Sequence, residues 1–390
     1  MRSALVVLAA VVALAACGSD DDKDAAAATT EPPPTTAAPS TTITPTTTTV
    51  DGPFAAIDPI VSAFVDDNEL NGAGLIVVDA VDGIVLHEHW GEFSEDRISL
   101  IASSSKMISA GVLLHLADDG LLDLDAPVAD VADWGDGNPD VTPAQLLSNS
   151  SGLVGLAPNP FYEPYLCMFD AEAVLEDCGQ AIFTTPDDDG DVGPPDTAFD
   201  YGGAQWQVAG AVAEAASGQT WDQLIDEIYV QPCGLETLAF NNHFAQLPSL
   251  GYPTEFAADP STLAATDNPN IEGGAYVTTG DYGELLLMIL RDGRCGDEQV
   301  LSPEALDAML DDRIGAVYGG DAAPGTGYGL GWWIDRDTGL RSDPGLYGAT
   351  AWLDLEDGYG AYLVIEATGD EGLELALQLG PVIDEAIAIR

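Results

Sequence analysis

The segment that most constrains the fold is residues 101–117, where a short polar start leads into an apolar run. From Met107 to Leu116 the side chains are apolar on almost every face that a helix would present, and Gly120 follows as a stop signal. A helix that is apolar on most faces is usually buried in the core of a domain. We therefore predict a central helix over residues 103–117, around which the folded part of the chain is organised.

Ser103 and Lys106 stand at the start of this helix. The chain has only two lysines in 390 residues, and the other, Lys23, lies in a low-complexity segment. Positions three apart share a helix face, so the serine hydroxyl and the lysine amine can meet. We expect burial and the positive end of the helix dipole to lower the pKa of Lys106, which makes it a base that activates Ser103. Backbone N–H groups at this helix end are natural donors to an oxyanion.

The Ser-x-x-Lys spacing is a weak signal when it stands alone. A capping serine followed by a lysine that extends to the surface has the same spacing. The near absence of other lysines favours the catalytic interpretation.

The histidines are weaker candidates. His87 and His89 alternate along one predicted strand and share a face, which indicates a solvated strand more than a metal site. His115 is interpreted as a satisfied core residue, and His243 stands in a loop without an obvious partner. None of them supports a Ser-His-Asp arrangement.

The first 50 residues predict export and a membrane tether. Residues 1–16 carry one arginine and an apolar run too short to span a membrane, as in a signal peptide. Leu-Ala-Ala-Cys ending at Cys17 resembles a bacterial lipoprotein cleavage box, which implies that Cys17 carries lipid; the alternative is an ordinary signal peptide with an incidental cysteine. Residues 17–50 are rich in Thr, Pro and Ala and predict a disordered tether. We therefore expect a cell-envelope lipoprotein on the outer face of the membrane.

Charge and cysteine content limit the partners of the remaining chain. The formal net charge of −56 excludes nucleic acid as a partner and discourages contact with anionic lipid headgroups. Four cysteines follow Cys17, and an even number in an exported protein predicts two disulfides with three pairings open. Proximity favours one pair and leaves the other, and no close spacing indicates a zinc site. The favoured pairs are Cys167–Cys178 and Cys233–Cys295.

Strand signals lie near both ends of residues 51–390, which we interpret as one catalytic unit of two interleaved subdomains. Between them, residues 121–274 predict helices and long loops, including a clear helix over 205–216. Strands early and late with helices between predict one sheet assembled from both chain ends. The expected strands are 73–79, 84–90, 328–335, 349–355 and 360–366, with helices over 54–65 and 371–389.

Five segments occur in an order that resembles one family, the penicillin-recognising serine hydrolases. This family comprises class C β-lactamases, D-Ala-D-Ala carboxypeptidases and related esterases and amidases. The segments are 101–106, 120–128, 141–153, 273–282 and 301–304. The resemblance implies a mixed α/β (α+β) fold of the β-lactamase/DD-peptidase type, with an antiparallel sheet flanked by helices and a mostly helical subdomain. It also implies an acyl-enzyme on Ser103 and no required cofactor or metal.

The family's second motif is commonly Tyr-x-Asn just before a helix, and residues 199–203 occupy that place. The resemblance implies that Tyr201 relays protons with Lys106, whose ammonium would lower the pKa of the phenol. The alternative is a buried aromatic at a helix entry. Gly203 replaces the asparagine, which removes an amide that commonly helps to position substrate.

The third motif, usually Lys-Thr-Gly or His-x-Gly on a strand, falls within residues 343–349. The best match is Leu346-Tyr347-Gly348, where Gly348 permits close backbone approach. The N–H groups of Ala349 and Ser103 are the expected oxyanion donors.

No cation heads this third motif. Its loss weakens the case for a substrate with a free carboxylate, which penicillins and D-Ala-D-Ala peptides both carry. Arg336 and Arg341 are candidates to replace it from nearby. The favoured function is therefore an exported hydrolase of esters or amides, including cell-wall peptides. The alternatives are a true β-lactamase or D-Ala-D-Ala carboxypeptidase, and a non-catalytic envelope lipoprotein; substrate identity and oligomeric state stay open.

Overall fold

The predicted sheet is present, and both ends of the chain build it. In the computed structural model, seven antiparallel strands run in the order β2-β1-β12-β11-β10-β9-β8, so the first strand pairs with the last. The strands are β1 (Gly72–Asp79), β2 (Gly83–Gly91), β8 (Thr326–Tyr328), β9 (Trp333–Asp335), β10 (Arg341–Pro344), β11 (Thr350–Asp354) and β12 (Tyr359–Val364). The expected fold class is confirmed.

The structure describes residues 52–138, 140–157, 159–185, 191–247, 251–253 and 259–390. The predicted signal sequence, Cys17 and the tether lie outside the described residues. Among the helices that are described, none is both long and apolar enough to span a bilayer.

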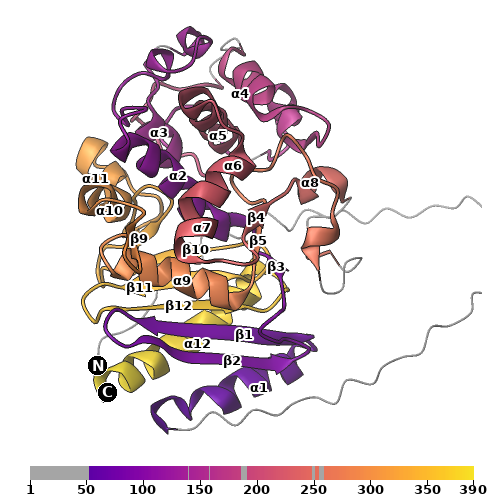
Figure 1. The fold of residues 1–390 in the computed structure, drawn as a ribbon, viewed down its shortest axis with the longest axis vertical. Helices are drawn as coiled ribbons and strands as arrows, with labels where there is room; N and C mark the ends of the chain where they lie inside the picture. The colour runs from indigo at the N-terminus through magenta and orange to yellow at the C-terminus, as the bar shows by residue number, and fades with distance from the viewer. Residues whose placement is uncertain (1–51, 139, 158, 186–190, 248–250, 254–258) are drawn as a thin grey trace, which may run out of the picture.

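Helices cover both faces of the sheet (Figure 1). Alternate residues of β1 face opposite layers: Leu75 and Val77 pack with α1 and α12, whereas Ile76 and Val78 belong to the larger core that includes α2 and α9. This alternation follows from the period of a β-strand. These helices are α1 (Ile57–Asp67), α2 (Lys106–Asp118), α9 (Thr279–Leu290) and α12 (Gly369–Ala388).

Helix α2 lies between the sheet and the helical region and packs against α5 (Ala204–Ser217) and α10 (Pro303–Leu310). Its residues from Lys106 to Leu114 are all buried. The predicted central helix is thus confirmed, with one difference. A 3₁₀ turn over Ala102–Ser105 comes first, and the α-helix begins at Lys106.

The helical region is built from the middle of the chain, as expected, and stands beyond the sheet in Figure 1. A small three-stranded sheet, ordered β3-β5-β4, lies between the two parts. The remaining elements are β3 (Ser99–Leu100), α3 (Pro143–Leu147), α4 (Leu175–Phe183), α6 (Trp221–Ile225), α7 (Gln231–Cys233), β4 (Ala239–Phe240), α8 (His243–Gln246), β5 (Ala275–Val277), β6 (Arg294–Cys295), β7 (Glu298–Gln299) and α11 (Arg313–Tyr318).

Some predicted boundaries are wrong. The expected strand over 328–335 is two strands, β8 and β9, because a turn separates them. Gly331 in that turn has a φ of +87° and passes so close to α2 that an added Cβ would lie 2.8 Å from the Lys106 carbonyl oxygen. The first helix begins at Ile57, after a 3₁₀ turn over Gly52–Phe54. Strand β10 was not predicted, because its four residues are mostly polar and end in a proline.

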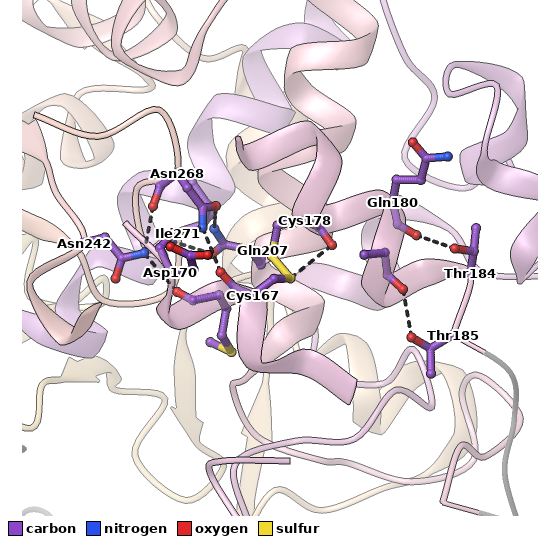
Figure 2. The surroundings of a disulfide bond; sticks show 12 residues. Cys167, Asp170, Cys178, Gln180, Thr184, Thr185, Gln207, Asn242, Asn268 and Ile271 are labelled. Carbon is purple, nitrogen blue, oxygen red and sulfur yellow. Dashed lines mark hydrogen bonds between the residues drawn. A yellow bond between two sulfur atoms is a disulfide. The ribbon is translucent and has the colours of Figure 1, made fainter. Parts of the chain in front are cut away.

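Both predicted disulfides are present. Cys167, in a 3₁₀ segment over Glu163–Phe169, is joined to Cys178 of α4, with Cα atoms 5.5 Å apart. Cys233 and Cys295 join α7 to β6 at a Cα separation of 4.8 Å. Figure 2 shows that amide side chains surround the first disulfide: Asn268 donates to the Cys167 carbonyl at 2.9 Å.

Candidate active site

The nucleophile candidate follows a strained backbone position. Ala102 has a φ of +45°, in the left-handed region that non-glycine residues rarely adopt and that costs of order 1–3 kcal/mol. Ser104 and Ser105 are buried and donate to the carbonyls of Asp343 and Ala102, both at 2.6 Å. Only Ser103 of the three consecutive serines is partly exposed. The turn therefore presents the Ser103 hydroxyl and withdraws its two neighbours.

Lys106 lies completely buried beneath Ser103. Its Nζ donates to the Ser103 Oγ at 3.1 Å and to the Glu272 carbonyl at 3.1 Å, and it lies 3.3 Å from the Glu272 Oε2. The rings of Tyr201 and Trp206 lie beside it, with centroids 4.8 and 5.6 Å from Nζ. The predicted meeting of the serine hydroxyl with the lysine amine is observed.

The expected lowering of the Lys106 pKa is wrong. Burial acts to lower it, but Tyr201, Glu272 and Asp343 together raise the pKa of Lys106 above its ordinary value. The prediction failed because both carboxylates come from distant parts of the chain. Lys106 is thus an ammonium at neutral pH, and its neutral form becomes populated as the pH rises.

Tyr201 ends a loop just before α5 and is partly exposed, like Ser103. Its ring packs against Trp333 at a centroid distance of 4.9 Å. Burial raises the pKa of Tyr201 by more than Lys106 and a hydrogen bond with Ser103 lower it. The expected lowering of this pKa is therefore also wrong, and Tyr201 is a neutral phenol that can give a proton.

The backbone N–H groups of the two glycines in the second motif both donate hydrogen bonds. Gly202 donates to the Asn149 Oδ1 at 2.9 Å, and Gly203 donates to the Glu272 Oε2 at 2.7 Å. Asn149 also accepts from the Trp206 indole at 2.8 Å, which fixes the start of α5. The N–H of Gly203, the glycine that replaces the motif's asparagine, is thus engaged by Glu272.

The third motif lies in a different register. Strand β10 ends at Pro344, and residues 346–348 form a three-residue hairpin turn, closed by hydrogen bonds from Gly348 to the Gly345 carbonyl and from Gly345 to the Ala349 carbonyl. Gly345 approaches the nucleophile: an added Cβ would lie 2.0 Å from the Ile101 carbonyl oxygen. Gly348, for which we predicted a close approach, is also tightly packed, but against Ile365, where an added Cβ would lie 2.6 Å from a side-chain carbon.

The two predicted oxyanion donors, Ala349 and Ser103, come from the two segments that meet where Gly345 contacts Ile101. Ala349 is buried, and its carbonyl lies 3.4 Å from the Ser104 Oγ. The roles of the Ala349 and Ser103 N–H groups in holding an oxyanion stay predictions.

Asp343 stands two residues before Gly345, in place of the family cation. It is buried, and its Oδ2 accepts from the Met107 N–H at 3.2 Å. Burial raises the pKa of Asp343 well above its ordinary value, although Lys106 and the Met107 N–H lower it. A buried acid therefore stands beside the nucleophile where the family motif has a positive charge.

Neither proposed substitute cation is free. Arg336 forms ion pairs with Asp312 and Asp321. Arg341 donates to the Leu310 carbonyl at 3.1 Å. These contacts leave neither guanidinium available to a substrate carboxylate near Ser103.

An aromatic wall adjoins the residue before the nucleophile. Tyr347 is buried against Ala102, and its ring lies 5.4 Å from His243 and 6.1 Å from Phe244. We define the aromatic wall as His243, Phe244, Asn270 and Tyr347. Among the described residues, the Tyr347 hydroxyl, both His243 nitrogens and both Asn270 amide atoms are buried without a hydrogen-bond partner. Burial lowers the pKa of His243 to about 3, so this ring is neutral.

The other histidines have structural partners. His87 and His89 both contact the Thr279 hydroxyl, at 2.8 and 3.2 Å. The His115 Nδ1 lies 2.7 Å from the Val300 carbonyl oxygen. No group of three or more metal-ligating side chains occurs in the part of the chain that the structure describes.

Sequence reasoning missed Glu272, Asp343 and Asn149, although each lies at a segment that carried the resemblance or the motif. Asn149 is part of the segment 141–153, and Glu272 directly precedes the segment 273–282. Asp343 opens the stretch that held the third motif. Their positions gave the only available signal, because their contacts depend on the fold.

Known proteins resemble this chain over most of its length. A family model described as Beta-lactamase matches residues 57–379. Penicillin-binding protein 4 of Amycolatopsis lactamdurans is 26% identical over 303 residues, which cover 73% of this chain and 76% of that protein. Lovastatin esterase of Penicillium rubens is 25% identical over 364 residues, covering 82% and 88%. A penicillin-binding protein homologue from Caulobacter crescentus shares the fold, with a TM-score of 0.66, 18% identity and coverage of 86% and 99%.

Proposed function

The chain belongs to the beta-lactamase family of serine hydrolases, and from that premise we propose that it hydrolyses esters or amides through an acyl-enzyme on Ser103. One observation carries the proposal: the only lysine of the described residues is buried with its Nζ 3.1 Å from the one partly exposed serine of the turn. A serine hydroxyl beside a base is the arrangement of an activated nucleophile.

Acylation begins when the Ser103 oxygen attacks the carbonyl carbon of the substrate and its proton passes to the neutral amine of Lys106. The bond to the leaving group then breaks, and the leaving group takes a proton from the Tyr201 phenol, which Lys106 replaces. The raised pKa of Tyr201 ensures that the phenol carries its proton before it acts.

Deacylation reverses these proton transfers. Water attacks the acyl carbon and gives a proton to Lys106, and the Ser103 oxygen leaves and takes that proton back. Because the neutral amine of Lys106 is the reactive form and its pKa is raised, we expect turnover to increase with pH through the neutral range.

The charges around Ser103 favour a substrate without a free carboxylate. Asp343 stands where the family has a cation, and Arg336 and Arg341 are engaged elsewhere. The relative from Penicillium rubens, an esterase, supports this reading. The relative from Amycolatopsis lactamdurans keeps a penicillin or a cell-wall peptide as the second candidate.

We also propose that the chain is exported and anchored through lipid on Cys17. The sequence before residue 51 motivates this placement, and two disulfides agree with an oxidising compartment. Mass spectrometry of the mature N-terminus tests it: a diacylated Cys17 is expected, and an unmodified N-terminus elsewhere would contradict it.

Intact-mass spectrometry with two probes tests the activity. The protein is exposed to a fluorophosphonate and, separately, to a penicillin, with Ser103→Ala as the control. We expect a fluorophosphonate adduct that is absent from the control, and no penicillin adduct.

A penicillin adduct on Ser103 would favour a substrate with a free carboxylate. No adduct with either probe on folded protein would favour a non-catalytic binding lipoprotein. Turnover of a p-nitrophenyl ester by Ser103→Ala or Lys106→Ala at the wild-type rate would overturn the nucleophile assignment.

A further inference from the structure

Glu272 binds Lys106 through both its backbone and its side chain, although the reaction above gives it no part. Its backbone carbonyl accepts from the Lys106 Nζ at 3.1 Å, and its carboxylate oxygen lies 3.3 Å from the same nitrogen. The side chain is 8% exposed. An ionised carboxylate this deeply buried requires a charged or hydrogen-bonding partner, and Lys106 is that partner.

Two glycines make room for this carboxylate. Gly203 donates its N–H to the Glu272 Oε2 at 2.7 Å, and a Cβ on Gly202 would lie 2.7 Å from the same oxygen. Gly202 has a φ of +68° and Gly203 a φ of +77°, values that residues with a side chain rarely adopt. The second motif has therefore lost an amide side chain, and a carboxylate from another segment lies on its backbone.

We infer that Glu272 is the positioning residue that holds Lys106 in the orientation and charge state that Ser103 requires, an inference that rests on the proposed function. The geometry gives the orientation. An ammonium has three N–H donors, and Lys106 directs them at the Ser103 oxygen, the Glu272 carbonyl and the Glu272 carboxylate. When the amine is neutral, its two N–H groups stay on Glu272 and its lone pair faces the Ser103 hydroxyl.

The charge state follows from the groups around Nζ. Tyr201, Glu272 and Asp343 face it, besides the neutral hydroxyl of Ser103. Of these three, Glu272 alone forms an ion pair with Nζ among the described residues, and it also binds Nζ through its carbonyl oxygen. Glu272 is therefore the neighbour whose carboxylate is placed to oppose deprotonation of Lys106.

The low lysine content allows a direct test by NMR. Full-length protein labelled with [¹³Cε]lysine contains two labelled sites, Lys106 and Lys23. Lys23 serves as the internal reference and is expected to titrate near the ordinary lysine pKa of about 10.4. In the wild type, the Lys106 resonance should keep its ammonium position at pH values where Lys23 has begun to titrate.

The decisive variant is Glu272→Gln, which keeps the size of the side chain and removes its charge. We expect the midpoint of the Lys106 titration to fall by about 1 to 3 pH units and to enter the measured range. Asp384→Asn is the matched control. Asp384 lies on helix α12, on the other side of the sheet from Lys106, and its carboxylate accepts from the Tyr359 hydroxyl of β12, so its loss should leave the midpoint unchanged.

Kinetics supply the second readout. For a p-nitrophenyl ester, log(kcat/KM) of the wild type should keep rising with pH across the range in which the protein is folded, whereas Glu272→Gln should level off at lower pH. Its plateau should also lie below the wild-type rate at high pH, because the lone pair of Lys106 is no longer oriented. A structural role alone would lower the rate by the same factor at every pH.

An unchanged Lys106 midpoint in folded Glu272→Gln would overturn the inference. Should that variant not fold, Glu272→Asp replaces it: the shorter carboxylate should lower the midpoint by a smaller amount, and an unchanged or higher midpoint overturns the inference. The titration needs no turnover. An inactive wild type without a fluorophosphonate adduct would refute the proposed function, while the midpoints would still decide whether Glu272 controls Lys106.

Discussion

Two sides of Ser103 differ in how their polar atoms are satisfied. On the lysine side, the Lys106 ammonium, the Glu272 carboxylate and the Gly203 N–H bind one another at 2.7 to 3.3 Å. On the side of the aromatic wall, buried atoms of His243, Asn270 and Tyr347 have no partner within the described structure. Each such atom costs about 1–3 kcal/mol of stability.

On the lysine side, Lys106, Glu272 and the Gly203 N–H hold one another before any substrate arrives, as a site that moves protons requires. Two neighbouring atoms, the Asp343 Oδ1 and the Asn149 Nδ2, have no partner among the described residues. On the aromatic wall, the buried atoms of three side chains lack partners, so this side is the less well satisfied. The predictions below disturb the two sides in turn.

Removing the proton donor of the lysine side should have the largest effect. Tyr201→Phe keeps the ring against Trp333, at 4.9 Å, and deletes only the hydroxyl. We expect kcat for a p-nitrophenyl amide to fall by about 10² to 10⁴, while the fluorophosphonate still labels Ser103. A kcat within a few-fold of the wild type would show that Tyr201 is a packing residue only.

Asp343→Asn should change how stability depends on pH. The pKa of Asp343 is raised in the folded protein, so between the ordinary aspartate pKa and the raised value the native state binds more protons than the unfolded chain. Wild-type stability should therefore fall as the pH rises, by up to about 1.4 kcal/mol per pH unit. The amide does not titrate, and it keeps an acceptor for the Met107 N–H.

Urea unfolding at pH 5, 6 and 7 measures this effect. The unfolding free energy of Asp343→Asn should rise relative to the wild type at each step. A constant difference across the three pH values would mean that Asp343 is ionised in the native state.

Replacing His243, on the aromatic wall, should have the smallest effect of the three substitutions. His243→Phe removes two buried nitrogens without partners and keeps a ring against Phe244, whose centroid is 3.9 Å away. We expect the free energy of unfolding to rise by about 1–3 kcal/mol. Because the His243 pKa is lowered to about 3, activity between pH 5 and 8 should show no step from this residue. Lower stability of the variant in urea would mean that the imidazole has partners.

The sequence predicted the parts of the molecule that depend on local pattern. The apolar run after Ser103 became α2, and the period of residues 73–79 placed β1 between two layers. Strand β10 was missed, because a short polar segment ending in Pro344 has no strand pattern. Its position relative to the nucleophile is shown by Gly345, whose backbone contacts Ile101.

The chemistry of the site was predicted less well than its residues. Ser103 and Lys106 could be paired because they are three positions apart. Glu272 lies 166 positions from Lys106, and no local pattern announces such a contact. The signs of the two pKa shifts at Lys106 and Tyr201 depend on that contact and on the depth of burial, so neither was available from the sequence.

The disulfide between Cys167 and Cys178 is linked to this site by a chain of amide hydrogen bonds (Figure 2). Asn268 binds the Cys167 carbonyl and accepts from Gln207, and Gln207 accepts from the N–H of Ile271, the residue before Glu272. A covalent bond in the helical region thus reaches, through three hydrogen bonds, the segment that carries Glu272. A chain folded without this disulfide would contain every catalytic side chain, yet that segment would lack its covalent anchor.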